Sequence, residues 1–250
     1  MRFAGLLIAC GFMTRLPIAS ERLRLESGAL ALAAPWLPST GIIVGIAVAV
    51  AAGVGGLISA EIGGLFGLIA WVAMTGALHL DGLGDSADAA GAAHGDPERY
   101  RAVLKDPHAG NFAVVAIGLQ LLAKFAVIAA LVPHGGVALV GVLVIAAWAR
   151  FGALVAAFTL PSMGSGLCST LRQGIDRQVL TVNVAALMLL SVVVAPVLLV
   201  APLIIWLAIA LWQRGPVMIN GDGLGALIEI FESVLLVALL IGIASGSNWF

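Results

Sequence analysis

The sequence has very few charged residues. Asp, Glu, Lys and Arg together make up 10% of the 250 residues, whereas hydrophobic residues make up 62%. Soluble globular domains typically contain about 25% charged and about 45–50% apolar residues. So few charges cannot cover the surface of a water-soluble fold of this size, and a soluble globular domain is excluded. The formal net charge of −1 also gives no reason to expect a nucleic-acid partner.

Cysteine is also scarce. The two cysteines, Cys10 and Cys168, lie far apart in the chain and suggest neither a disulfide nor a metal site. The segment Leu7–Cys10 (LIAC) superficially matches a lipoprotein processing signal, but its apolar stretch is very short and only Arg2 precedes it. An interfacial helix at the amino end fits this pattern better.

Long uncharged runs are the most prominent feature of the chain. Residues 41–52 and 181–210 contain no Asp, Glu, Lys or Arg, and about 20 consecutive apolar residues are enough to cross a bilayer. In lipid the backbone must satisfy its own hydrogen bonds, so only helices or closed barrels can span it. Barrel strands alternate polar and apolar residues, whereas these runs are apolar on every face. The sequence therefore predicts an all-α, polytopic integral membrane helical bundle.

We expect a single membrane domain over residues 1–250, with about six to seven transmembrane helices. Pro196 and Pro202 favour two helices in the long apolar stretch after Leu180, because proline ends or kinks a helix. One long kinked span is the alternative. The expected segments lie near 36–58, 62–80, 111–132, 136–158, 179–197, 201–219 and 224–246.

The distribution of basic residues predicts the orientation. The connections near 59–61, 133–136 and 200–201 carry no Lys or Arg, whereas the alternate ones do. Because cytoplasmic loops carry an excess of Lys and Arg, the amino terminus and the motif segment 79–110 should be cytoplasmic, with Phe250 outside. The basic residues on the predicted cytoplasmic side are Arg2, Arg15, Arg22, Arg24, Arg99, Arg101, Lys105, Arg172, Arg177 and Arg214.

Three aspartates stand out in the segment 79–110. Asp81, Asp85 and Asp88 have the spacing i, i+4, i+7, which places them on one stripe of a helix. Like charges at this spacing repel one another, so a compensating cation is expected, and carboxylate oxygens suit Mg²⁺ or Mn²⁺. The alternative is a solvated helix end. Because acids are scarce here and the trio directly follows an apolar span, a metal site is favoured.

Other polar residues of this segment are candidates for substrate binding. His79 would point to the opposite side of a continuous helix from the aspartates, so its role is open. Arg99 and Arg101 fit either the charged face of an amphipathic helix or a phosphate-binding role. For Lys105 and Asp106 a functional role is favoured.

Two cations remain within the predicted spans. Lys124 and Arg150 would be costly in a membrane if unpaired, so they either pair with acids or face a cavity that holds an anionic substrate. The alternative is a side chain that extends to the membrane interface, which suits Arg150 better than the deeper Lys124. Asp222 and Glu229 are seven residues apart and share a helix face, and Glu232 follows. These acids are natural partners for the two cations, or for a second metal ion.

Carboxylates, a metal ion and basic groups at a membrane surface suggest phosphoryl transfer. The chain contains no Walker A loop, no Gly-x-Ser-x-Gly elbow and no His-Glu-x-x-His pattern, which removes several competing chemistries.

Several segments together resemble the cobalamin synthase family, also called adenosylcobinamide-GDP ribazoletransferase. The most specific are HLDGLGDSADAA (His79–Ala90) and LKDPHAGNFAV (Leu104–Val114). The resemblance continues, in order through nearly the whole chain, in FMTRLPI (Phe12–Ile18), PWLPSTGIIVG (Pro35–Gly45), LLAKF around Lys124, WARFGA around Arg150 and GDGLGALIEIFE (Gly221–Glu232). The sequence departs from the family pattern at His108, where an arginine is usual, and at Asn220, where a threonine is usual.

The resemblance implies an Mg²⁺-dependent enzyme of a bacterial-type inner (plasma) membrane, multi-pass, with its active site facing the cytoplasm. The family joins adenosylcobinamide-GDP to α-ribazole, or to its 5′-phosphate, and releases GMP. On this basis Asp81 and Asp85 would bind Mg²⁺ on the pyrophosphate, and Asp88 would bind metal or act as the base, which makes Asp85 and Asp88 the candidate catalytic residues. The candidate substrate-binding residues are His79, Lys105, Asp106, Lys124, Arg150, Asp222, Glu229 and Glu232.

Two alternatives remain from the sequence. A CDP-alcohol phosphotransferase uses similar chemistry, but its usual aspartate pattern is not met. A cation transporter would use the aspartates as an ion site, although such a site is expected near the midplane rather than beside the spans. The partners expected are the two substrates and membrane lipid. The sequence leaves open whether the chain forms a homo-oligomer and whether other enzymes of the cobalamin pathway dock on its loops.

Overall fold

A computed structural model describes residues 2–18, 28–106, 108–164, 166–215 and 218–246. Arg22, Arg24 and Phe250, which entered the predicted orientation, lie outside the described residues, as does the side chain of Arg2.

The described residues are almost entirely helical. Their only β-type pairing is an isolated parallel bridge between Ser162 and Ile219. The elements are α1 (Arg2–Met13), α3 (Ala29–Ala33), η1 (Ala34–Trp36), α4 (Leu37–Gly56), α5 (Ala60–Thr75), α6 (Leu78–Ala93), α7 (Pro97–Val103), α8 (Asn111–Leu131), η2 (Val132–His134), α9 (Gly135–Thr159), α10 (Leu167–Gln173), α11 (Arg177–Val194), η3 (Pro196–Val200), α12 (Ala201–Trp212) and α13 (Gly221–Ala244).

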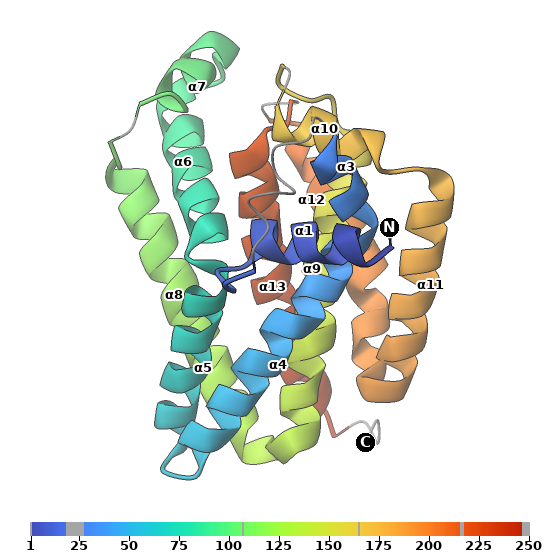
Figure 1. Ribbon diagram of the computed structural model, residues 1–250. Coiled ribbons are helices and arrows are strands. Elements are labelled where there is room, and N and C mark those ends of the chain that lie inside the picture. The colour runs from blue at the N-terminus through green and yellow to red at the C-terminus, as the bar shows by residue number, and fades with distance from the viewer. Residues whose placement is uncertain (1, 19–27, 107, 165, 216–217, 247–250) are drawn as a thin grey trace.

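The predicted all-α polytopic class is confirmed. By length and composition, four helical stretches of the described chain could cross a membrane, or up to five if the bent pair α5–α6 is one span. One of the four, Asn111–Thr159, contains both α8 and α9, which run in opposite directions (Figure 1). The expectation of six to seven spans counted these two separately and included α12, which has only 12 residues.

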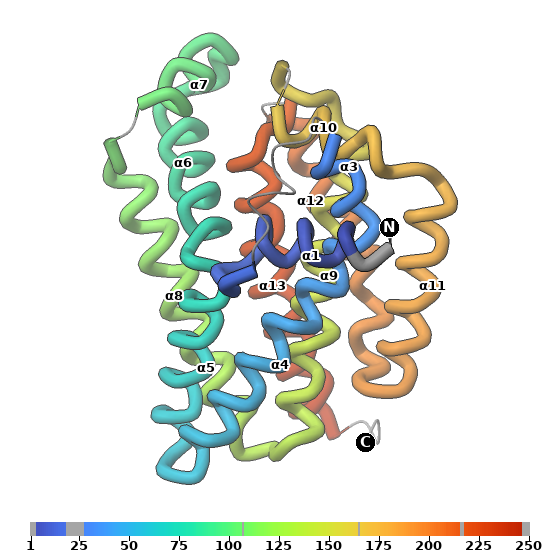
Figure 2. The backbone as a smooth tube through the Cα atoms, viewed as in Figure 1, coloured from blue at the N-terminus to red at the C-terminus, as the bar shows by residue number. Residues whose placement is uncertain are grey.

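The long helices surround α9 and α13. Helix α9 is buried along most of its length, and the main core contains Trp148 and Leu154 from α9 and Phe231 from α13. The short helix α1 runs across this bundle instead of along it (Figure 2). Its placement at a membrane interface stays a prediction.

The predicted break near Pro196 is confirmed. Helix α11 ends at Val194, the turn η3 starts at Pro196, and α12 starts at Ala201. Proline lacks the backbone N–H that would continue the first helix, so the chain reverses here.

A second break separates the aspartate helix from the apolar span before it. Helix α5 ends at Thr75, and the next two residues, Gly76 and Ala77, have left-handed backbone angles, with φ of 61° and 60°. A left-handed residue commonly ends a helix, and α5 and α6 are bent by 86° relative to each other. The expected apolar segment near 62–80 is therefore split, and α6 does not continue along the axis of α5.

Candidate active site

The aspartate stripe lies on a continuous helix, as the spacing predicted. Helix α6 runs from Leu78 to Ala93 and carries Asp81, Asp85 and Asp88. At Gly82 the helix contacts the start of α13 so closely that an added Cβ atom would lie 2.6 Å from the carbonyl oxygen of Asp222. Only glycine allows this approach, which brings Asp81 next to Asp222.

Three carboxylates gather at this contact. Asp81 is exposed, whereas Asp85 and Asp222 are half-buried. Asp85 lies within electrostatic range of both Asp81 and Asp222, and no cation of the described residues pairs with any of the three. The arrangement concentrates negative charge where α6 meets α13, and a bound cation would relieve it.

Asn220 orients Asp222 and was missed by the sequence interpretation. Its side-chain amide donates a hydrogen bond of 2.7 Å to Oδ2 of Asp222. Its side-chain oxygen accepts a 2.9 Å bond from the N–H of Gly223 and so caps α13. The available signal was an asparagine directly before a helix that begins Gly-Asp-Gly, a common N-cap position.

The donor set suits a hard divalent cation. No group of three or more His, Cys, Asp or Glu side chains in the described part of the chain is arranged to hold a metal ion by itself. Mg²⁺ is usually held by one or two carboxylates together with substrate phosphates and water, and rarely by an all-protein cage. Asp81 and Asp222 offer carboxylate oxygens of this kind beside a cavity, and Asp85 lies within electrostatic range of both, so the three fit Mg²⁺ bound jointly with a phosphorylated substrate.

Asp88 has a different environment from the other two aspartates of the stripe. It is buried, and its two carboxylate oxygens accept hydrogen bonds from the N–H groups of Gly110, at 2.6 Å, and Ala113, at 2.9 Å. These groups belong to the start of α8, where backbone donors lack helical partners. Asp88 therefore caps α8 from a neighbouring helix, and its role as metal ligand or base stays a prediction.

The cap predicts a stability effect of Asp88→Asn. The amide can accept only one of the two bonds, so the free energy of unfolding should fall by about 1–3 kcal/mol. Thermal unfolding in detergent can be followed with a thiol-reactive dye, because Cys10 and Cys168 are buried. Burial, and secondarily the charge of Asp222, raises the pKa of Cys168 to about 12, so the folded protein should react slowly. Glu98→Gln, at an exposed position of α7, is the control for loss of one negative charge; an equal midpoint for both variants would contradict the capping role.

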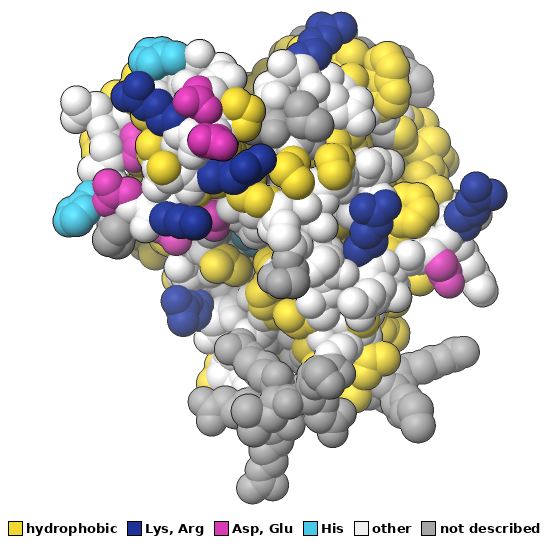
Figure 3. Space-filling view, turned by 90° about the horizontal axis from the view of Figure 1, so that it is seen from above, with side chains coloured by type: hydrophobic (Ala, Val, Ile, Leu, Met, Phe, Trp, Pro, Cys, Tyr) yellow, Lys and Arg dark blue, Asp and Glu magenta, His cyan; other side chains and the backbone are white. Residues whose placement is uncertain are grey.

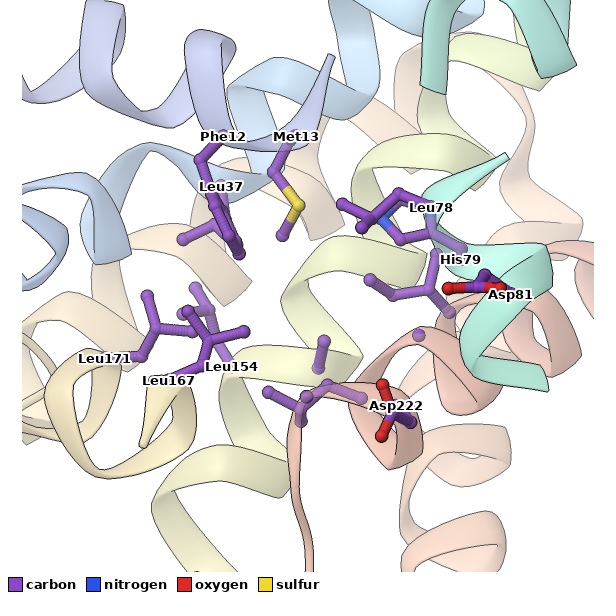
Figure 4. Close-up of a pocket in the computed structure, with 15 residues that line it drawn as sticks. Phe12, Met13, Leu37, Leu78, His79, Asp81, Leu154, Leu167, Leu171 and Asp222 are labelled. Atoms are coloured by element: carbon purple, nitrogen blue, oxygen red, sulfur yellow. The ribbon is translucent and has the colours of Figure 1, made fainter. Parts of the chain in front are cut away.

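A cavity of about 150 Å³ opens beside the carboxylates. His79, Asp81 and Asp222 lie at one end of it, and Leu167 and Leu171 lie at the other (Figure 4). The side chain of His79 is only 2% exposed, and neither of its ring nitrogens has a hydrogen-bond partner among the described residues. His79 therefore belongs to the site, on a different side of α6 from the aspartate stripe.

The predicted pairing of the two membrane cations with acids of the last helix is confirmed for Glu229 and Glu232, whereas Asp222 pairs with neither cation. The amine of Lys124 bonds Glu229 at 2.6 Å and Glu232 at 2.5 Å, and the guanidinium of Arg150 pairs with the other oxygen of Glu232. All four side chains are at most 3% exposed. They form a charge-neutral cluster, here called the buried ion cluster, that joins α8, α9 and α13.

Two further residues support this cluster and were missed from the sequence. Gln120 donates to Oε2 of Glu229 at 2.7 Å, and the amine of Lys124 lies 4.5 Å from the ring centroid of Trp71, a cation–π contact. In this geometry the cluster holds helices together. The prediction that Lys124, Arg150, Glu229 and Glu232 bind substrate stays a prediction.

Lys105 and Asp106 lie in the exposed connection between α7 and α8, and neither lines the cavity. The ring of His108 lies 2.7 Å from Oδ1 of Asp106, and this hydrogen bond holds the pKa of Asp106 below its usual value. Phosphate binding by Lys105 stays a prediction.

Charged side chains gather at one end of the bundle. Helices α7 and α10 lie at that end, and the α4–α5 and α8–α9 turns lie at the other (Figure 1). Seen from the α7 and α10 end, the surface carries many Lys and Arg side chains, with Asp, Glu and His concentrated on one side (Figure 3). The α4–α5 and α8–α9 turns at the opposite end contain no Lys or Arg, which agrees with the predicted alternation of basic and non-basic loops.

Comparison with known proteins gives the family. A family model described as cobalamin-5-phosphate synthase matches residues 5–240. The chain belongs to the cobalamin-5-phosphate synthase family. Three relatives named adenosylcobinamide-GDP ribazoletransferase are similar over nearly their whole length. The relative from Novosphingobium aromaticivorans is 42% identical over 95% of this chain and 96% of the relative's chain. That from Thiobacillus denitrificans is 37% identical, over 97% and 98%, and that from Laribacter hongkongensis is 40% identical, over 95% and 96%.

Membership in the cobalamin-5-phosphate synthase family confirms the resemblance and makes the chain a transferase of cobalamin synthesis. It decides against the CDP-alcohol phosphotransferase and the cation transporter. No solved structure matches the chain.

Proposed function

We propose that the chain joins adenosylcobinamide-GDP to α-ribazole, or to its 5′-phosphate, with release of GMP. The observation that carries this proposal is the meeting of Asp81 and Asp222, from two helices, beside a cavity that can admit a substrate. In the reaction the 3′-hydroxyl oxygen of ribazole bonds to the cobinamide-linked phosphorus. The bond from that phosphorus to the bridging oxygen breaks, GMP leaves with that oxygen, and the hydroxyl proton passes to a base or to water.

The carboxylates at the contact of α6 and α13 would hold Mg²⁺ together with the pyrophosphate. When bound, the metal would neutralise charge that develops on the leaving phosphate. Asp81, Asp85 and Asp222 would fix its position, and Asn220 keeps Asp222 oriented through the 2.7 Å hydrogen bond. Lys105, on the same polar end, would attract the anionic substrate.

We also assign the chain to a bacterial-type inner membrane, as a multi-pass protein with the active site facing the cytoplasm. The concentration of basic side chains at the polar end supports this orientation (Figure 3), because cytoplasmic loops are enriched in Lys and Arg.

The direct test uses purified protein in liposomes with adenosylcobinamide-GDP, α-ribazole 5′-phosphate and Mg²⁺. Cobalamin 5′-phosphate and GMP should appear in equal amounts by chromatography. EDTA should abolish both, and excess Mg²⁺ should restore them. Well-folded protein that forms neither product, or that is unaffected by EDTA, would contradict the proposal.

A further inference from the structure

The cavity beside the carboxylates has a size that limits what can enter it. Its volume is about 150 Å³, and a dry apolar cavity of about this size holds a benzene-sized aromatic molecule. A corrin ring is far too large. The cavity therefore fits a small, flat group of one of the two substrates.

The walls of the cavity are mostly apolar. Phe12, Met13, Leu37, Leu154, Leu167 and Leu171 line it, and Figure 4 shows the leucines 154, 167 and 171 together at the end away from the carboxylates. These side chains come from helices α1, α4, α9 and α10, so several distant segments build one pocket. An apolar wall selects against a group with many hydrogen-bonding atoms, because those atoms would lose water without gaining a partner.

This selection separates the bases of the two substrates. Guanine has several donors and acceptors on its ring edges and would leave them unpaired here. The base of ribazole is a benzimidazole with two methyl groups, which is flat and apolar except for one unsubstituted ring nitrogen. A phospholipid chain would also suit the apolar walls, but an acyl chain has no acceptor for His79, which lines the cavity without a hydrogen-bond partner among the described residues.

His79 offers a partner for that single polar atom. It is 2% exposed, lines the cavity and has no hydrogen-bond partner for either ring nitrogen among the described residues. A neutral imidazole has one N–H donor, and a buried donor without a partner costs free energy. A ligand that supplies one acceptor would remove this cost.

We propose that this cavity binds the benzimidazole base of the ribazole substrate, with the apolar side chains holding the rings and His79 donating to the free ring nitrogen. The inference rests on the proposed function. It also explains the position of the carboxylates, because the ribose attached to a base held here would lie toward Asp81 and Asp222, where the hydroxyl must react.

The test uses a variant that narrows the cavity, and it measures the KM for each of the two substrates separately. Leu167 is half-buried on the short helix α10, so Leu167→Phe should fold. We expect it to raise the KM for α-ribazole about tenfold or more, since a methylene-sized misfit in a pocket costs about 10- to 200-fold in specificity. The KM for adenosylcobinamide-GDP should change less than about twofold. The matched control is Leu119→Phe, on the outside of α8 with 63% exposure, which should change neither KM.

A second substrate and a second variant make the test specific. A ribazole analogue without the two methyl groups is smaller, so Leu167→Phe should impair it less than it impairs α-ribazole. Leu167→Ala widens the cavity. It should weaken the binding of α-ribazole and leave the KM for adenosylcobinamide-GDP unchanged. Equal effects on both substrates, or a rise in KM for adenosylcobinamide-GDP alone, would overturn the assignment.

Equilibrium dialysis of α-ribazole against the same variants gives a readout that does not need turnover. Wild-type protein that binds α-ribazole, with binding weakened in Leu167→Phe, supports the pocket even if no product forms, in which case only the proposed reaction fails. Binding of α-ribazole that is equal in wild type and Leu167→Phe, or that is displaced by phospholipid alone, would overturn the pocket.

Discussion

Asp81→Asn and Asp222→Asn should each lower kcat/KM by about 100- to 1,000-fold, the range seen when one preorganised electrostatic group is removed from an active site. The two residues lie on α6 and α13, 141 positions apart in the chain, and meet only because Gly82 lets the helices touch. If both hold one metal ion, either substitution weakens the same site. Asparagine keeps the size of the side chain, so folding should be preserved.

The metal role gives a readout beyond activity loss. Each variant should need a higher Mg²⁺ concentration for half-maximal rate, because one anionic ligand is gone. The double variant should have a kcat/KM only slightly below that of either single variant, since the effects of groups that act as a unit are not additive. Glu98→Gln, at an exposed position of α7, is the control for loss of one negative charge and should behave as wild type. Additive losses with an unchanged Mg²⁺ requirement would show that the two aspartates do not share a metal.

Glu232→Gln should destabilise the protein by about 3–5 kcal/mol, the cost of breaking a buried ion pair by removing one partner. Glu232 is fully buried and accepts from both Lys124 and Arg150. Without its charge, two cations share the single carboxylate of Glu229, and the buried ion cluster gains a net positive charge in surroundings that solvate it poorly.

The measurement is the thermal unfolding midpoint in detergent, followed through the two buried cysteines. A loss of this size corresponds to a fall of roughly 10 °C for a chain of this length. Arg150→Gln combined with Glu232→Gln restores neutrality and should recover at least half of that fall. Glu98→Gln should leave the midpoint unchanged. Two results would show that the buried ion cluster does not hold α8, α9 and α13 together. One is a midpoint of Glu232→Gln within 2 °C of wild type, and the other is a midpoint of the double variant below that of Glu232→Gln.

The spacing of residues along the chain was enough to predict part of the candidate site. The i, i+4, i+7 spacing correctly placed Asp81, Asp85 and Asp88 on one helix, because helical periodicity depends only on the chain itself. The same spacing could not distinguish Asp88, whose oxygens are taken up by backbone donors of α8. Those donors come from a segment more than 20 residues away, and only packing brings them there.

The cost of charge in a membrane made the pairing of Lys124 and Arg150 predictable. A cation within a span needs an acid as its partner, and few acids lie within the predicted spans. Which acid pairs with which cation was not predictable, since Asp222 shares a helix face with Glu229 yet lies at the other site. The supporting contacts of Gln120 and Trp71 depend on the side-chain packing of α5, α8 and α13.

Hydropathy, charge and helical spacing act locally along the chain. They are therefore enough to predict the membrane class, the helical architecture, the basic end of the bundle and the carboxylates of the candidate site. The partition of the acids into two groups depends on how the helices pack. Asp81 and Asp222 line the cavity with Asp85 in electrostatic range, and Glu229 and Glu232 belong to the buried ion cluster. Only the tertiary structure decided the cavity itself. Its walls come from segments spread over most of the chain, and no local pattern specifies a space enclosed by residues that meet only when the helices pack.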